Sequence, residues 1–279
     1  MVEIGKFSRL RAVRKADAGV WLDGMDAGDI FMPRGYAQST CTVGEDVEVF
    51  VFPGPDGQLL ATTDKPLALA GEFALLKVAS VTPVGAFLDW GLKKDLLVPF
   101  SEQKEKMEKG KSYIVYVFHD RKTGRIVASS KLNRFLGRQP ADYKEGQRVE
   151  LLICGQTEIG YRAIIDNSRW GILYRNEIFQ PVKKGQRLQG FIKKMRDDGK
   201  IDLCLQKQGH EKIGEVSDKI IEALKAQGGF VAITDNSPAA AVYRMFGISK
   251  KTYKKAVGAL YKKRMISIEE KGIRLTGKI

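Results

Sequence analysis

A unit of short strand-like segments recurs three times along this chain, and the repetition limits the possible folds more than any single motif does. In each unit a turn glycine precedes a stretch of alternating apolar and polar residues, which is the pattern of a half-buried strand. These glycines are Gly44, Gly110 and Gly185. A second turn then leads into another short strand, at Asp56-Gly57, Thr123-Gly124 and Asp198-Gly199. Such pairs favour tight hairpin turns, so each unit contains a predicted hairpin.

Each unit also has a matching front half, in which a glycine separates two apolar segments. These glycines are Gly19, Gly85 and Gly160. A glycine in this position marks a bend or bulge between strands. Five short strands in about 65 residues predict a small closed or nearly closed barrel, which leaves no long exposed sheet edge. We therefore expect three barrels, at residues 1–68, 69–138 and 139–210.

The C-terminal part, residues 211–279, has a helical period instead of a strand-like one. Apolar stripes, capping residues and terminal glycines predict three helices, over 216–228, 238–246 and 250–264, followed by a hairpin over 265–276. The expected caps are a polar residue in 235–237 ahead of Pro238, Gly247 after the second helix, and Ser249 before the third. Three helices and a hairpin are typical of a winged helix. The predicted fold class is thus mainly β, with three tandem five-stranded barrels and a C-terminal α+β domain.

Charge favours a polyanionic partner. The chain has 47 Lys and Arg against 33 Asp and Glu, for a net charge of +14. Each Lys or Arg placed on a phosphate releases condensed counterions and gains affinity that salt weakens. The alternative is surplus lysine on solvated faces. The first unit has more acidic than basic residues, whereas the rest of the chain is basic. Nucleic acid is therefore the favoured partner, and the first unit is expected to contribute least.

Four segments of the second unit form a characteristic series. They are Val78-x-x-Val81-x-x-Val84-Gly85-Ala86-Phe87-Leu88, Lys94-Asp-Leu-Leu-Val-Pro99, Gly110-Lys111, and Asp120-Arg121-x-x-Gly124-Arg125-Ile126-x-x-Ser129-x-Lys131. This pattern resembles the S1 RNA-binding domain, which is named after a protein of the small ribosomal subunit. The resemblance implies a five-stranded barrel of the oligonucleotide-binding (OB) type. The unit departs from the usual pattern at Pro99, where a histidine is common, and at Val84, where an aromatic residue is common.

The complete order of three such barrels and a winged helix resembles the conserved virulence factor B family of bacterial RNA-binding regulators over nearly the whole chain. The resemblance implies cytoplasmic RNA binding linked to the control of gene expression. It implies no catalytic chemistry.

The sequence contains few residues that could form a catalytic site. Its two histidines, His119 and His210, have no ligand cluster nearby, and His210 is expected in a linker. Gly110-Lys111-Ser112 lacks the earlier glycine of a phosphate loop, because position 105 is Glu. The three cysteines are far apart, and no apolar run is long enough to span a membrane. We expect no enzyme activity, no metal, no cofactor, no disulfide framework and no membrane contact.

Single-stranded nucleic acid is held by basic grooves and by exposed rings on which bases stack. Strands two and three of an OB barrel carry this surface. The candidates in the second unit are Phe87, Trp90, Lys93, Lys94, Arg121 and Lys131. In the third unit they are Tyr161, Arg169, Trp170, Lys193 and Lys194, with Arg162 and Tyr174 in the same pattern. In the winged helix they are Lys250, Lys251, Lys254 and Lys255. Alternation sends one residue in two inward, so each ring of the third unit has a core interpretation of equal weight, and a core position is the competing interpretation of Phe87. Trp21 and Phe31 suggest the same surface in the first unit with weaker support.

The sequence predicts a non-catalytic, cytoplasmic regulator that binds single-stranded RNA, in mRNA or in structured RNA. The ribosome or another RNA-associated protein is a further candidate partner. One alternative is a DNA-binding transcription regulator that acts through the winged helix. Another is a lysine-rich scaffold that docks on an acidic protein or ribosomal surface.

Overall fold

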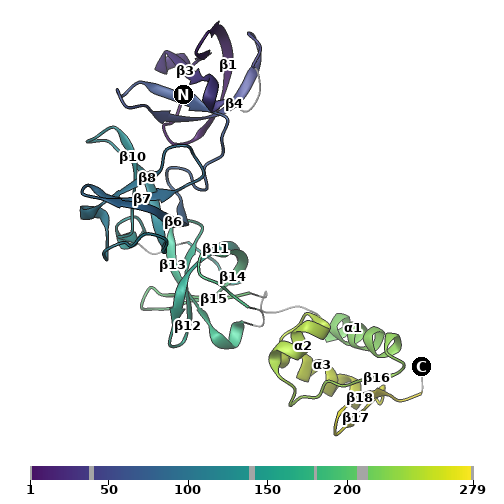
Figure 1. The fold of residues 1–279 in the computed structure, drawn as a ribbon. Helices are drawn as coiled ribbons and strands as arrows, with labels where there is room; N and C mark the ends of the chain where they lie inside the picture. Colours follow the sequence, from purple (N-terminus) through teal and green to yellow (C-terminus); the bar gives the residue numbers. More distant parts are fainter. Residues whose placement is uncertain (1, 38–40, 138–141, 179–180, 206–212, 278–279) are drawn as a thin grey trace.

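The computed structural model describes residues 2–37, 41–137, 142–178, 181–205 and 213–277. Three five-stranded β units follow one another in a row, and a small helical domain comes after them (Figure 1). The predicted fold class, tandem OB-type barrels with a C-terminal winged helix, is confirmed. In the described part of the chain, no helix is both long enough and apolar enough to cross a membrane.

The strands of the three β units correspond one to one. The first unit contains β1 (Phe7–Ala16), β2 (Gly19–Asp23), β3 (Asp29–Pro33), β4 (Asp46–Pro53) and β5 (Leu59–Thr62). The second contains β6 (Phe73–Thr82), β7 (Gly85–Asp89), β8 (Leu96–Pro99), β9 (Ser112–Asp120) and β10 (Arg125–Ser129). The third contains β11 (Arg148–Thr157), β12 (Gly160–Ile165), β13 (Arg169–Tyr174), β14 (Arg187–Met195) and β15 (Ile201–Cys204). A short 3-10 turn follows the third strand of each unit, at Arg34–Tyr36, Phe100–Glu102 and Arg175–Glu177.

The sheets curl into barrels in the same way. In the first and third units, the third strand pairs in parallel with the fifth, which closes the barrel. In the second unit the hydrogen-bonded order is β10-β9-β6-β7-β8, and the two end strands lie beside each other. The first strand of every unit contains a register shift, at Ala12/Arg14, Val78/Ser80 and Ile153/Gly155. Such bulges bend a strand and increase its twist, which allows the first strand to pair with two different strands of a small barrel.

The glycine that begins the second strand is required by close packing. A Cβ added at Gly85 would lie 2.3 Å from the carbonyl oxygen of Val98, and one at Gly160 would lie 2.2 Å from that of Leu173. Only glycine lets the second strand approach the third so closely. This glycine therefore fixes the register that decides which later side chains point outward.

One hydrophobic cluster spans the first two barrels, beside a separate core within the first barrel. Phe50 and Phe52 on β4 pack in the same cluster as Trp90 and the interior of the second barrel. The Phe50 and Trp90 rings meet edge to face, with centroids 5.7 Å apart. Backbone bonds complete the junction, including one of 2.9 Å from the Ala70 amide to the Gly5 carbonyl. The two barrels are consequently coupled in stability.

A second junction joins the second and third barrels. Phe73 and Leu136 pack against Leu152 and Ile164 of the third barrel. The Arg187 guanidinium donates a 2.6 Å hydrogen bond to the carbonyl oxygen of Phe73. The three barrels thus form a continuous unit.

The C-terminal domain is built from α1 (Ile213–Ala226), β16 (Phe230–Val231), α2 (Ala239–Phe246), α3 (Lys250–Lys262), β17 (Ile266–Glu269) and β18 (Gly272–Leu275). The strands form a sheet in the order β16-β18-β17. Tyr253 on α3 is fully buried, and its hydroxyl donates a 2.8 Å hydrogen bond to the Ile233 carbonyl. This bond satisfies the one polar group of a ring that otherwise stacks on Phe246 and packs among apolar side chains.

Two of the predicted helix caps are confirmed and one is wrong. The Ser249 side chain accepts a hydrogen bond from the Thr252 amide, and Gly247 ends α2 in the left-handed conformation. The N-cap position of α2 is Pro238 itself, without a capping side chain, because Ser237 instead accepts a 2.9 Å bond from the Thr234 amide in the preceding turn.

Replacing Ser249 by Ala is expected to destabilise the winged helix by about 1 kcal/mol, because it leaves the Thr252 amide without its partner. Denaturant unfolding followed by far-UV circular dichroism measures this change, since the α-helices of the described structure lie in this domain. Lys255→Ala, at an exposed position on the same helix, should change the stability by less than about 0.5 kcal/mol. Equal stabilities of the two variants would contradict the capping role.

Candidate nucleic-acid interface

One position on the outer face recurs in all three barrels. It lies two residues after the glycine that begins the second strand, and it is occupied by Trp21, Phe87 and Arg162. Each residue pairs with the middle of the third strand, opposite Phe31, Leu97 and Ile172 respectively. Because side chains alternate along a strand, these residues point away from the barrel interiors.

In the second barrel, Phe87 is half-buried on the outer face, whereas its neighbours Ala86 and Leu88 fill the core. Its cross-strand neighbours are Ser80 on β6 and Leu97 on β8. Lys94, Arg121 and Lys131 are exposed. The register thus places the Phe87 ring on the strand-two and strand-three surface where OB barrels hold bases.

Two other candidates of the second barrel lie in the junction with the first barrel. Trp90 is only 5% exposed, and its indole nitrogen donates a 2.6 Å hydrogen bond to the Lys94 carbonyl. The Lys93 ammonium donates to the Gly35 carbonyl and lies 5.3 Å from the centre of the Tyr36 ring. Both side chains therefore hold the barrels together.

The first barrel carries an aromatic pair that the sequence supported only weakly. The Trp21 and Phe31 rings lie on adjacent strands with centroids 4.9 Å apart. The Arg14 guanidinium lies over Trp21 at 5.2 Å. Both rings are half-buried and Arg14 is exposed. The sequence signal for this aromatic pair was the alignment of Gly19 with Gly85, because it places Trp21 at the position that Phe87 occupies in the second barrel.

In the third barrel, the outer face is dominated by a stacked arginine. The Arg162 guanidinium lies over the Trp170 ring, with its central carbon 3.7 Å from the ring centre. The indole nitrogen of Trp170 donates a 2.8 Å hydrogen bond to the Asn133 side chain, from the segment after the second barrel. Partial burial lowers the pKa of Arg162, but a guanidinium stays protonated at neutral pH.

The remaining candidates of the third barrel differ in their surroundings. Tyr161 packs partly against the barrel core, and Arg169 lies against Gly137 in the junction between barrels. Lys193 forms a 2.5 Å ion pair with Glu177, and the hydrogen bond to this carboxylate raises the pKa of the lysine. Lys194 is exposed. A phosphate would therefore compete with Glu177 for Lys193, whereas Lys194 has no such carboxylate partner among the residues that the structure describes.

The winged helix presents a lysine-rich face on α3. Lys251, Lys254 and Lys255 are exposed and Lys250 is half-buried. The Lys254 ammonium lies 3.3 Å from the Asp235 carboxylate. The opposite face of α3 is in the core, so the lysines cover the outward side of this helix.

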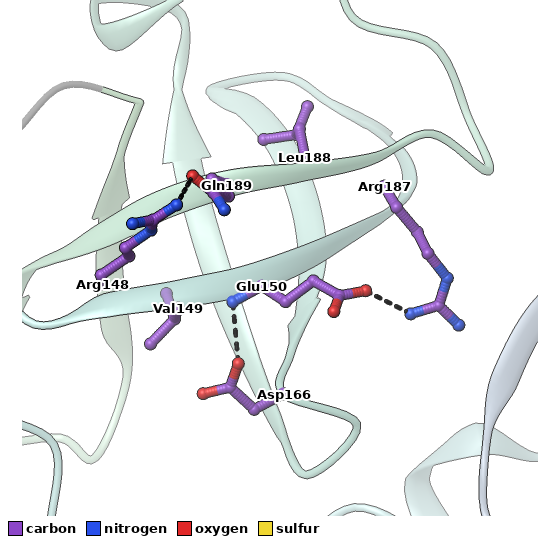
Figure 2. A pocket seen from close by; sticks show the side chains of 7 residues that line it. All are labelled: Arg148, Val149, Glu150, Asp166, Arg187, Leu188 and Gln189. Atoms are coloured by element: carbon purple, nitrogen blue, oxygen red, sulfur yellow. Dashed lines mark hydrogen bonds and ion pairs between the residues drawn. The ribbon is translucent and has the colours of Figure 1, made fainter.

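A pocket on the third barrel is lined by residues of the paired strands β11 and β14 and by Asp166 (Figure 2). Its charged side chains already have partners: Arg187 forms a 2.7 Å ion pair with Glu150, and the Asp166 carboxylate accepts a 2.8 Å hydrogen bond from the backbone amide of Glu150 (Figure 2). Arg148 donates to the Gln189 side chain. Because Arg187 also binds the second barrel, this pocket belongs to the framework of the junction.

The described residues offer no group of three or more His, Cys, Asp and Glu side chains arranged to hold a metal ion. In the part of the chain that the structure describes, Cys41, Cys154 and Cys204 form no disulfide. Burial raises the pKa of the Cys154 thiol to about 12, so this thiol is protonated and unreactive at neutral pH. His210 lies outside the described residues.

Comparisons with known proteins agree with this architecture. A family model described as an S1 domain matches residues 4–64 and 70–131, and one described as a CvfB-like winged helix domain matches residues 218–275. The third barrel lies outside these ranges but has the strand order of the first. S1 and winged-helix domains are nucleic-acid-binding modules, so the chain consists largely of such modules.

Staphylococcal proteins named conserved virulence factor B are similar to most of the chain. The protein from Staphylococcus aureus (strain bovine RF122 / ET3-1) is 26% identical over 243 residues, which are 85% of this chain and 81% of the relative. The protein from Staphylococcus epidermidis is 24% identical over 243 residues, with 85% and 82% covered. The predicted resemblance to this family is confirmed. A crystal structure of a multidomain protein with nucleic acid binding domains from Streptococcus pneumoniae aligns with 98% of each chain at 22% identity and a TM-score of 0.41.

Proposed function

We propose that this relative of the conserved virulence factor B proteins, built from S1 barrels and a CvfB-like winged helix, is a cytoplasmic protein that binds single-stranded RNA without catalysis. The barrels hold bases, and the basic winged helix adds phosphate contacts. The resulting role is post-transcriptional control of gene expression.

The observation that carries this proposal is the pair of outward rings, Trp21 and Phe87, at equivalent positions on the second strands of two barrels. Rings on an OB barrel surface stack on unpaired bases, which a duplex keeps inside its helix. Arg14, which lies over Trp21, and the exposed Arg121 of the second barrel supply charge for the backbone between stacked bases. Single-stranded nucleic acid fits this surface better than a duplex does.

The winged helix supports phosphate binding more than base recognition. Base reading in the major groove relies largely on Arg, Asn and Gln. The α3 sequence, KKTYKKAVGALYK, contains none of these residues, and its exposed cations are lysines. Lysine contacts to phosphates position a protein without specifying a sequence. This composition argues against a sequence-specific DNA regulator.

Single-stranded RNA is expected to bind more tightly than duplex DNA at equal salt, with the logarithm of affinity falling linearly against the logarithm of salt concentration. Fluorescence anisotropy with single-stranded RNA, duplex RNA and duplex DNA of equal length measures both quantities. The RNA recovered from these reactions should be uncut, with or without magnesium. Tighter binding of duplex DNA would overturn the proposal and favour the transcription-regulator alternative.

A further inference from the structure

The third barrel differs chemically from the other two at the equivalent outward position. Where the first two barrels present the rings of Trp21 and Phe87, the third presents the guanidinium of Arg162. A ring offers a stacking face to any base. A guanidinium in the same place adds a fork of hydrogen-bond donors, which distinguishes between bases.

Arg162 is held in one orientation by its surroundings. Its guanidinium lies 3.7 Å from the centre of the Trp170 ring. Trp170 is itself fixed by its bond to Asn133 and by packing in the junction between the second and third barrels. An arginine stacked on an anchored ring has already lost much of its rotational freedom, so it loses less entropy on binding a ligand.

The donors of Arg162 are free. Among the described residues, its side chain has no hydrogen bond or ion pair, in contrast to Arg148 and Arg187 on the same barrel. The space beside it is open, because its register partner on β11 is Gly155. A Cβ added at Gly155 would meet nothing within 4 Å. The equivalent partners in the other barrels are Arg14 and Ser80, which carry side chains.

We infer that Arg162 recognises a guanine base of the bound RNA, with Trp170 as its positioning residue. This inference rests on the proposed RNA binding. The guanidinium fork matches the adjacent O6 and N7 acceptors of guanine, which is the commonest specific contact of arginine with a base. Adenine presents an amino donor in place of O6, and this donor opposes the arginine fork. The open floor at Gly155 receives the base.

The test compares short oligouridines that carry one central guanine, adenine or 7-deazaguanine. The intact chain should bind the guanine oligomer about tenfold more tightly than the adenine oligomer. The 7-deazaguanine oligomer lacks the N7 acceptor and should lose most of this preference. Arg162→Lys keeps the charge but removes the fork, so it should bind all three oligomers with nearly equal affinity and an unchanged salt slope.

Arg148→Lys is the matched control, because Arg148 is an exposed arginine of the same barrel that already binds Gln189. It should keep the guanine preference, and both variants should melt at the temperature of the intact chain. A guanine preference that survives in Arg162→Lys overturns the inference, as does equal binding of the three oligomers by the intact chain. In the second case RNA binding itself would still stand. Failure of the intact chain to bind any oligomer would instead overturn the proposed function.

Discussion

Replacing Trp90 by Ala should cost about 3–5 kcal/mol of stability, as truncation of a buried aromatic side chain typically does. Trp90 is 5% exposed, packs edge-on against Phe50 of the first barrel, and donates its indole hydrogen to the Lys94 carbonyl. The variant loses the packing and leaves that carbonyl without its partner. The loss is a large fraction of the stability of a typical domain. Denaturant unfolding followed by tryptophan fluorescence and circular dichroism measures it.

Trp21→Ala is the matched control, because it makes the same truncation at a half-buried position on the outer face of the first barrel. It should unfold close to the intact chain but bind single-stranded RNA more weakly. Trp90→Ala should show the reverse, with RNA affinity retained at temperatures where the barrels stay folded. If Trp90→Ala were as stable as Trp21→Ala, the shared core between the two barrels would be wrong.

The contrast between Trp21 and Trp90 shows which side-chain positions the sequence can predict and which it cannot. Alternation within a strand predicts that one residue in two points inward, but it left a core position open for Phe87 and Trp21. The register of the folded strands places both rings on the outer face. Trp90 follows β7, in the connection to β8, where that period no longer applies. It lies in a core that two barrels share, and a contact between units far apart in sequence leaves no periodic signal.

The same reason explains the positions of Lys93 and Arg169. Both are in basic, aromatic-rich segments that indicate nucleic-acid binding, yet Lys93 binds Gly35 of the first barrel and Arg169 lies against Gly137. The structure supplies the contacts between barrels, which the sequence pattern of basic and aromatic residues does not indicate. For Arg162 the structure strengthens the case for a binding role. It shows that Arg162 stacks on Trp170 and that Asn133 holds Trp170 in place, and the sequence pattern indicates neither contact.

The winged helix was predicted more completely because its signals are local. Helix caps and apolar stripes act within a few residues, so Gly247 and Ser249 mark the ends of α2 and the start of α3. The strand β16 was not predicted, because Phe230–Val231 is too short to show a period. Its pairing with β18 is set by tertiary packing.

Replacing Phe87 by Ala should weaken binding of single-stranded RNA by about 1–3 kcal/mol, because a base loses its stacking partner. The salt dependence should stay the same, since no phosphate contact is removed. The stability should fall by about 1 kcal/mol or less, because the ring contributes a cross-strand contact with Leu97 outside the core. Titrations of labelled RNA at several salt concentrations, together with thermal melting, separate these effects.

Two further variants at Phe87 isolate the stacking contribution, and one at Arg121 isolates a charge contribution. Phe87→Tyr keeps the ring and should bind RNA almost as well as the intact chain. Phe87→Leu keeps apolar volume without a ring, so its RNA binding should resemble that of Phe87→Ala.

Arg121→Ala, in the exposed turn between β9 and β10, should reduce the salt slope by about one and weaken the binding of all RNA sequences alike. A Phe87→Ala protein that melts far below the intact chain would assign the ring to the core. A normal melt with unchanged affinity would remove Phe87 from the RNA surface and leave Trp21 as the remaining outward ring at this position.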